Sequence, residues 1–163
     1  MGQLTLPASG SVYIDADAVI YSVEKIEPYW TLLQPMWAAA KAGQFAIIGS
    51  ELLLLETLVK PFQTGDTTLE KSFRDLLLNA TEVRLVPMSI TVLESAARLR
   101  AQLGLRTPDA IHAATALAAG CALFATNDKG FRRVSGLAVA VLSECITTPS
   151  SVAETIRIFI AAM

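Results

Sequence analysis

Four acidic residues stand in sequence settings that favour burial over exposure to water. Asp15 follows the apolar run SVYI, and Glu56 lies among leucines in GSELLLLETLVKP. Asp109 opens the Ala-rich stretch TPDAIHAATALAAG, and Asp128 follows the apolar run CALFA. A buried carboxylate without a partner protonates or binds a cation. Oxygen ligands without an accompanying set of His and Cys favour Mg²⁺ or Mn²⁺ over Zn²⁺, so the sequence predicts a site for a hard divalent cation.

Each of these acids also has an ordinary structural explanation. Asp109 suits the first turn of a helix, Asp128 could cap a short helix, and Asp15 could form a turn after a strand. Glu56 could pair with Lys60 one helical turn further on. What favours a shared site is their joint placement, because the functional crevice of an open α/β sheet lies outside the carboxyl ends of its strands.

Two further polar residues lie close to these acids in the sequence. Asp17 is predicted either as a cation ligand or ligand-supporting residue, or equally as the N-cap of the helix that follows. His112 comes three residues after Asp109 and therefore shares its helical face. It could reach the site as a ligand or general base, but a single His in an Ala-rich helix is more often packed and hydrogen-bonded, which is the interpretation we favour.

Strand and helix signals alternate along the chain, which predicts an α/β fold with a central, mainly parallel sheet. The expected strands are 11–14, 45–49, 83–86, 121–125 and 137–142, and the expected helices are 28–42, 50–60, a segment from about 66, 89–103, 107–119 and 151–162.

Residue types at the helix ends predict where the helices begin and stop. Ser50 is expected to cap the second helix and Pro61 to stop it, while Thr67 and Glu70 have the spacing of a capping box. Thr107 is expected to cap the Ala-rich helix, with Pro108 at its first position. In 89–103, one face is expected to carry the apolar residues and another a Glu94–Arg98 pair; the apolar residues are Ile90, Leu93, Ala97 and Ala101.

Composition predicts one domain, 1–163, with a substantial core, since 53% of the 163 residues are hydrophobic. The formal charge of −2 suits nucleic-acid binding poorly, although four acids bound to cations would turn it to +2. Cys121 and Cys145 have no metal-ligand spacing and indicate a reducing compartment. Because no apolar run is long enough to span a membrane and no secretory signal opens the sequence, we expect a cytoplasmic protein.

The chain resembles the PIN-domain ribonucleases, and especially the toxins of VapBC-type toxin–antitoxin pairs. The resemblance rests on YIDADAVIY, SELLLLETLVKP, LRTPDAIHAATAL and CALFATNDKGF, which follow one another in the family's order and spacing. It implies a three-layer α/β/α fold and places the family's acidic quartet on Asp15, Glu56, Asp109 and Asp128. Asp17 departs from the family, which often has Asn or a small polar residue there.

The resemblance further implies metal-dependent hydrolysis of RNA, in which Mg²⁺ or Mn²⁺ held by the quartet activates a water molecule. Thr126 and Asn127 would hydrogen-bond a ligand or a phosphate. The basic residues Lys129, Arg132 and Arg133 would contact RNA, or else form an ordinary solvated face.

The resemblance also implies a cognate antitoxin and a homodimer. The helices around Trp30, Trp37 and residues 76–78 would supply core or partner-contacting apolar surface. Two other functions stay open: a PIN scaffold that only binds protein, and a haloacid-dehalogenase-type phosphatase, whose Asp-x-Asp start DADAV fits. The phosphatase also needs a downstream lysine and a later acidic pair, which Lys129 after the lone Asp128 matches poorly.

Overall fold

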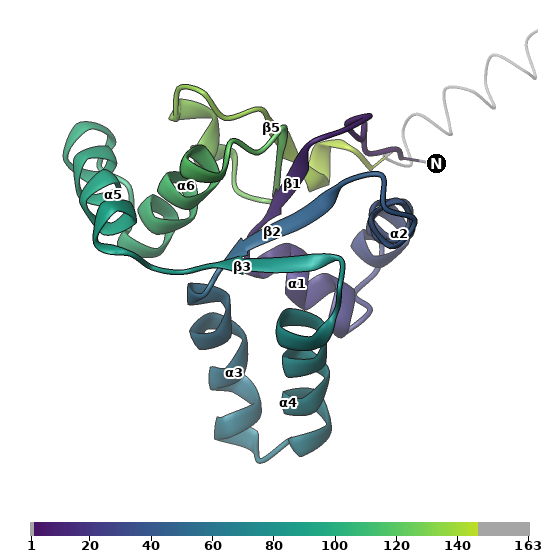
Figure 1. Cartoon of the computed structure of the whole chain (residues 1–163). Helices are drawn as coiled ribbons and strands as arrows, with labels where there is room; N and C mark the ends of the chain where they lie inside the picture. The colour runs from purple at the N-terminus through teal and green to yellow at the C-terminus, as the bar shows by residue number, and fades with distance from the viewer. Residues whose placement is uncertain (1, 147–163) are drawn as a thin grey trace, which may run out of the picture.

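A single parallel sheet forms the centre of the molecule, and the computed structural model describes residues 2–146 (Figure 1). The sheet order is β3-β2-β1-β4-β5, and all four pairings are parallel. The strands are β1 (Ser11–Ile14), β2 (Ala46–Ser50), β3 (Val83–Val86), β4 (Leu123–Thr126) and β5 (Val139–Val141). The predicted five-stranded sheet is therefore confirmed. The helix expected at 151–162 lies outside the described residues.

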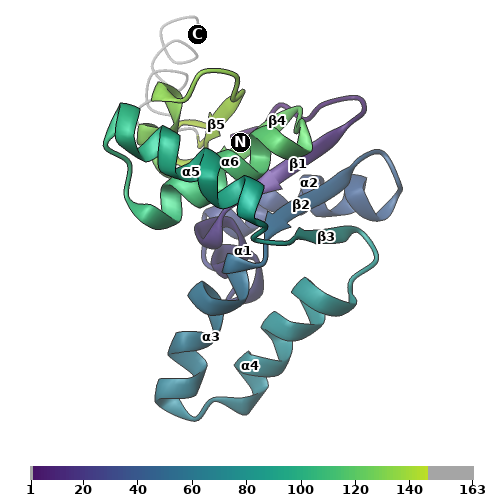
Figure 2. The ribbon, with the colours of Figure 1, turned by 60° about the vertical axis from the view of Figure 1, so that its left-hand side comes forward.

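Helices cover both faces of the sheet, which gives the three layers that the sequence implied (Figures 1 and 2). The helices are α1 (Ala16–Val23), α2 (Tyr29–Lys41), α3 (Leu52–Thr64), α4 (Thr67–Arg74), α5 (Ile90–Leu103) and α6 (Thr107–Ala119). On β1, Val12 and Ile14 enter the core that α1 to α4 cover, whereas Tyr13 enters the core beneath α5 and α6. This alternation is the two-residue period of a strand buried on both faces.

The strand order reverses at β1. The chain adds β2 and β3 on one side of β1, then returns to place β4 and β5 on the other side. β1 and β4 are hydrogen-bonded neighbours, with Tyr13 opposite Phe124 and Ile14 opposite Ala125. The carboxyl ends of these two strands form the topological switch point, where open α/β sheets bind their ligands.

The predicted end of α3 and the predicted start of α4 are wrong in detail. Pro61 lies inside α3, where its missing N–H removes one hydrogen bond but does not end the helix. The helix ends at Gly65, which adopts the left-handed conformation. α4 is capped by Asp66, whose carboxylate accepts the Leu69 N–H at 2.9 Å, so Thr67 does not start a capping box. Glu70 instead pairs with Arg74.

The start of α6 is also shifted by one residue. Arg106 occupies the N-cap position without a side-chain cap bond, so Thr107 is the first helical residue and Pro108 the second. Ser50 does assist α3, because its hydroxyl accepts the Leu52 N–H at 3.1 Å, although the N-cap residue itself is Glu51.

The apolar face predicted on α5 is the one exposed to solvent. Ile90 is 77% exposed and Leu93 is 44% exposed, whereas Val92 and Ala96 on the opposite side are buried against α6. The small side chains of α6 allow the face of α5 that carries Val92 and Ala96 to pack closely against α6. Glu94 and Arg98 form no ion pair in the structure.

None of the helices within residues 2–146 combines the length and hydropathy needed to cross a lipid bilayer.

Candidate active site

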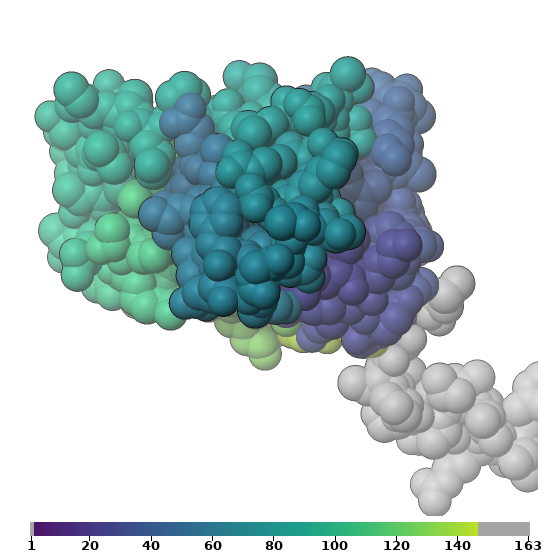
Figure 3. Space-filling view, turned by 90° about the horizontal axis from the view of Figure 1, so that it is seen from below, coloured from purple at the N-terminus to yellow at the C-terminus, as the bar shows by residue number. Residues whose placement is uncertain are grey.

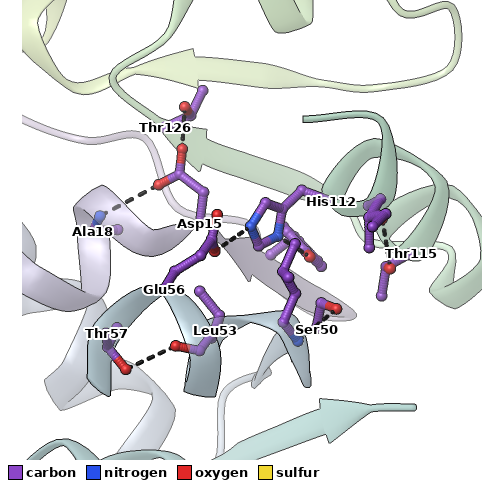
Figure 4. A network of polar contacts seen from close by, with 12 residues as sticks. Asp15, Ala18, Ser50, Leu53, Glu56, Thr57, His112, Thr115 and Thr126 are labelled. Atoms are coloured by element: carbon purple, nitrogen blue, oxygen red, sulfur yellow. Dashed lines mark hydrogen bonds and ion pairs between the residues drawn. The ribbon is translucent and has the colours of Figure 1, made fainter. Parts of the chain in front are cut away.

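Asp15 and Asp128 come from neighbouring strands at the switch point, and the hydroxyl of Thr126 links them. The Thr126 Oγ1 donates to Asp15 Oδ2 at 2.5 Å (Figure 4). The same Oγ1 accepts the Asp128 N–H at 3.0 Å. The other Asp15 oxygen accepts the Ala18 N–H at 3.3 Å and caps α1. The N-cap role predicted as one option for Asp17 therefore belongs to Asp15, and Asp17 lies in the first turn.

Asp15 is a buried carboxylate, with only 6% of the residue exposed. Burial raises its pKa to about 6, although the hydrogen bond from Thr126 acts in the opposite direction. The pKa of Asp17 is also raised, first by partial burial and then by the carboxylates of Asp128, Glu56 and Asp109. The site thus concentrates negative charge that its own partners do not fully neutralise, and a cation would relieve this repulsion.

Glu56 is held by a buried chain of hydrogen bonds. Its Oε2 lies 2.7 Å from His112 Nε2, and His112 Nδ1 lies 2.7 Å from the Tyr13 hydroxyl (Figure 4). A carboxylate only accepts, so Nε2 carries a proton, and in a neutral imidazole Nδ1 accepts from Tyr13. Burial raises the pKa of Tyr13, which keeps the hydroxyl protonated and able to donate. Tyr13 and His112 therefore fix where the Glu56 carboxylate points.

The structure decides between the alternatives for these two residues. Glu56 does not pair with Lys60, which instead binds Glu24, the residue that follows α1. His112 is packed and hydrogen-bonded, as we expected, with 2% of the residue exposed. It nevertheless borders the site, because it helps to line the pocket described next.

The four predicted acids meet at one small pocket of about 140 Å³. We call it the acidic pocket, and it is lined by Asp15, Ala16, Asp17, Glu56, Arg106, Asp109, His112, Asp128 and Phe131. Its acids come from the end of β1, the start of α1, the middle of α3, the first turn of α6 and the segment after β4. Segments far apart in the sequence are thus brought together by the parallel sheet.

Arg106 is a residue of the site that the sequence prediction missed. Its Nε donates to Asp109 Oδ2 at 2.9 Å, and one terminal nitrogen lies 3.9 Å from Asp128 Oδ2. Charges three residues apart often interact near a helix start, so the spacing of Arg106 and Asp109 was an available signal. Its approach to Asp128 depends on the tertiary fold and has no sequence signal.

Comparison with known proteins assigns the family. Residues 12–137 match the family model for the PIN domain, which is most of the chain. The chain belongs to the PIN-domain family. PIN domains are generally nucleases that use divalent metal ions. No curated protein matches the sequence significantly.

Solved structures share the PIN fold with this chain. VapBC2 from Rickettsia felis, bound to a DNA fragment from its promoter, aligns with a TM-score of 0.62 and 18% identity over 80% of this chain and 97% of that one. A toxin–antitoxin complex from Klebsiella pneumoniae aligns with a TM-score of 0.60 and 20% identity over 80% of this chain and 97% of that one. VapBC-5 from Mycobacterium tuberculosis, a member of the VapBC family of toxin–antitoxin systems, aligns with a TM-score of 0.52 and 20% identity over 82% of this chain and 97% of that one.

Asn127 lies beside the acidic pocket of this PIN domain but is engaged elsewhere. Its amide nitrogen donates to the hydroxyls of Tyr21 and Tyr29 at 3.2 and 3.1 Å, and its oxygen accepts the Ser143 N–H at 2.9 Å. It therefore fixes the segment after β4 against α1 and α2, and it does not line the pocket.

The basic residues expected to contact RNA are already paired. Lys129 Nζ lies 3.1 Å from Glu144, and Arg132 forms a two-pronged ion pair with the same carboxylate. Arg133 donates to the carbonyl of Leu103 at 2.8 Å. Lys129 and Arg132 thus share one carboxylate, which compensates part of their positive charge.

The donor chemistry of the acidic pocket fits a hard divalent cation, because its ligands would be carboxylate oxygens. Within residues 2–146, no three acidic, His or Cys side chains converge on a single point as they stand. Arg106 contacts two of these acids: its guanidinium donates a hydrogen bond to Asp109 and lies within ion-pair distance of Asp128. A cation that bound both carboxylates would compete with Arg106 for them.

Proposed function

We propose that this PIN domain is a Mg²⁺- or Mn²⁺-dependent endoribonuclease in which Asp15, Glu56, Asp109 and Asp128 hold the cation. One observation carries the proposal: these four carboxylates, from four separate segments, line one pocket at the switch point of the sheet. A protein has no structural need to gather acids there, since their mutual repulsion is unfavourable without a cation.

Neighbouring residues contact all four carboxylates. Thr126 and the Ala18 N–H fix Asp15, the Tyr13–His112 pair fixes Glu56, and Arg106 contacts Asp109 and Asp128. When bound, the cation would lower the pKa of a water molecule and stabilise charge on the leaving oxygen of a phosphodiester. The buried Asp15 and the hydrogen-bonded, partly buried Glu56 would set the cation's position, and the more exposed Asp128 would adapt to the substrate.

We further infer that the chain acts as the toxin of a toxin–antitoxin pair in the cytoplasm, and that a protein partner covers exposed apolar surface on α3. Leu55, Val59 and Phe62 are 65%, 45% and 59% exposed and recur at helical spacing along one side of α3. The α3–α4 hairpin protrudes below the sheet in Figures 1 and 2, and its tip faces the viewer in Figure 3. The partner would be the cognate antitoxin or a second copy of the chain.

The residues first considered for partner contact behave differently from one another. Trp37 is buried and donates to Ser22 Oγ at 2.8 Å, so it belongs to the core. Leu77 is also buried, whereas Leu78 is 52% exposed and adds to the apolar surface near α4. Trp30 is partly buried against the core.

The decisive experiment compares cation binding with RNA cleavage. Calorimetric titration with MgCl₂ and MnCl₂, and cleavage of a mixed RNA pool, would be run on the native chain, Asp15→Asn and Asp109→Asn, with Glu144→Gln as a control for loss of a surface carboxylate. The proposal expects binding and cleavage in the native chain and the control, and loss of both in the two pocket variants. Cleavage that persists in Asp15→Asn would contradict it, and cation binding without cleavage would favour a protein-binding scaffold.

The phosphatase alternative lacks its lysine. Lys129 is held by Glu144 and does not line the acidic pocket, so no lysine is positioned to stabilise a phosphoaspartate at Asp15. The geometry favours the nuclease.

A further inference from the structure

In the part of the chain that the structure describes, Arg106 is the only Lys or Arg that lines the acidic pocket. Its side chain is 79% exposed, yet its guanidinium contacts both Asp109 and Asp128. Among the described residues, the hydrogen bond to Asp109 is the only one its guanidinium makes, so most of its N–H donors stay available. Arg106 is therefore held by one hydrogen bond to Asp109 and one longer ion pair with Asp128.

A second hollow adjoins the acidic pocket and shares Arg106 with it. This hollow, of about 180 Å³, is lined by Gly104, Leu105, Arg106, Asp109, Asp128, Gly130, Phe131 and Arg133. We call it the arginine pocket, because Arg106 and Arg133 both line it. Arg106, Asp109 and Asp128 thus form the wall between a hollow rich in carboxylates and a hollow that carries two guanidinium groups.

A divalent cation and Arg106 compete for the same oxygens. Asp109 Oδ2 accepts from Arg106 Nε at 2.9 Å, and Asp128 Oδ2 lies 3.9 Å from the same guanidinium. An exposed ion pair contributes little to stability, so a dication that binds several carboxylates displaces the guanidinium easily. The displaced guanidinium remains at the mouth of the pocket, where its planar fork of donors matches the geometry of a phosphate.

We propose that Arg106 exchanges partners during function: cation binding at Asp109 and Asp128 releases its guanidinium, which then binds a backbone phosphate of RNA in the arginine pocket. This inference rests on the proposed nuclease function. Arg106 would be a charge-compensating residue in the metal-free protein and a substrate-binding residue in the loaded one. It would thereby favour RNA binding only after the cation has entered.

The first test measures cation affinity without RNA. Calorimetric titration of Arg106→Gln with MgCl₂ or MnCl₂ should show several-fold tighter binding than the native chain, because a competing positive charge has been removed. Arg74→Gln is the matched control, since Arg74 Nε makes an equivalent exposed pair with Glu70 at 3.0 Å on α4. Thermal melts of both variants would confirm that they fold.

The second test measures RNA affinity without turnover. A short fluorescein-labelled single-stranded RNA would be titrated with protein in CaCl₂ at low temperature, and a gel would confirm that the RNA stays intact. Arg106→Gln should bind about tenfold more weakly, and the slope of log affinity against log salt should fall by about 0.7, the value for one lost phosphate contact on a single strand. Arg106→Lys should recover part of the affinity, and Arg74→Gln should change neither quantity.

Opposite shifts of the two affinities are the specific signature of partner exchange. Weaker or unchanged cation binding in Arg106→Gln would overturn the inference, as would unchanged RNA affinity. If these results came from a native chain that binds cation and cleaves RNA, the nuclease proposal would survive alone. If the native chain neither bound cation nor cleaved RNA, both would fall.

Discussion

Asp15 and Glu144 are carboxylates near the carboxyl edge of the same sheet, and their surroundings shift their pKa values in opposite directions. Burial raises the pKa of Asp15 to about 6. Hydrogen bonds from Arg132 and Lys129 lower the pKa of the exposed Glu144 to about 2. The fold thus makes the charged form of Asp15 unfavourable and stabilises the charged form of Glu144. The difference points to a functional site, because carboxylates with strongly raised pKa values cluster at such sites and the proposed cation would compensate the charge of Asp15.

The largest difference between Asp15 and Glu144 is expected in the rate of RNA cleavage. Asp15→Asn should lower the rate of RNA cleavage by at least about 100-fold, the scale expected when a group that stabilises charge in a reaction is removed. Glu144→Gln should leave the rate nearly unchanged, since Glu144 does not line the acidic pocket. Initial rates on one RNA at saturating MnCl₂ would measure both variants. Similar losses in the two would show that the difference between these carboxylates has no functional meaning.

The second effect concerns stability, and it has the opposite sign to the loss of activity. In chelator-containing buffer at pH 7, Asp15→Asn should raise the free energy of unfolding by up to about 3 kcal/mol, because a pKa raised from 3.8 to about 6 makes the buried charge unfavourable. The native chain loses this stability as the pH rises from about 4 through 6. The advantage of the variant should therefore vanish below about pH 4. Urea unfolding at several pH values would measure it, and a variant less stable than native at pH 7 would contradict it.

A third prediction extends the comparison to Glu56, which is positioned by hydrogen bonds. Tyr13→Phe keeps the ring stacked on Phe124 but removes the hydroxyl that contacts His112. Loss of such a supporting bond should weaken cation binding about tenfold. Ser22→Ala is the matched control, because it removes a buried hydroxyl that accepts from Trp37. Calorimetry should show weaker cation binding in Tyr13→Phe only, and equal affinities would argue against the positioning role.

The smallest effect is expected at Glu144. Its lowered pKa means that its ion pairs favour the folded state above pH 4.5, and that this contribution is lost as the pH falls towards 2. Because Glu144 is exposed, solvent and salt screen the pairs, and Glu144→Gln should unfold at nearly the native temperature at pH 7. Differential scanning calorimetry at low and high salt would measure this. A large drop would mean that the Lys129–Glu144–Arg132 cluster holds the fold together.

Several features of the site could be predicted because they depend on neighbouring residues in the sequence. Asp15 and Asp128 were placed by the strands before them, and Asp109 by the Pro at the start of its helix. A parallel sheet brings such positions to one edge whatever the details of packing. This is why the five strands and the positions of the acids could be anticipated together.

The features that were missed depend on side chains from distant segments. The pairing of Glu56 with His112 required α3 and α6 to meet, and no local pattern reports that contact. The choice of the Val92 face of α5 for burial follows from close packing on the small residues of α6, whereas hydrophobicity alone favoured the Ile90 face. Arg106 was missed because its approach to Asp128 exists only in three dimensions.

The hydrogen bond between Glu56 and His112 also has a consequence for cooperativity. α3 packs mainly in the core on one face of the sheet, and α6 packs in the core on the other, so this bond joins the two helical layers past the end of the strands. Local opening of either layer must break it. Amide hydrogen exchange in α3 and α6 should therefore be coupled, so that the two layers unfold as one cooperative unit and the carboxylates of the acidic pocket are protected by the stability of the whole domain.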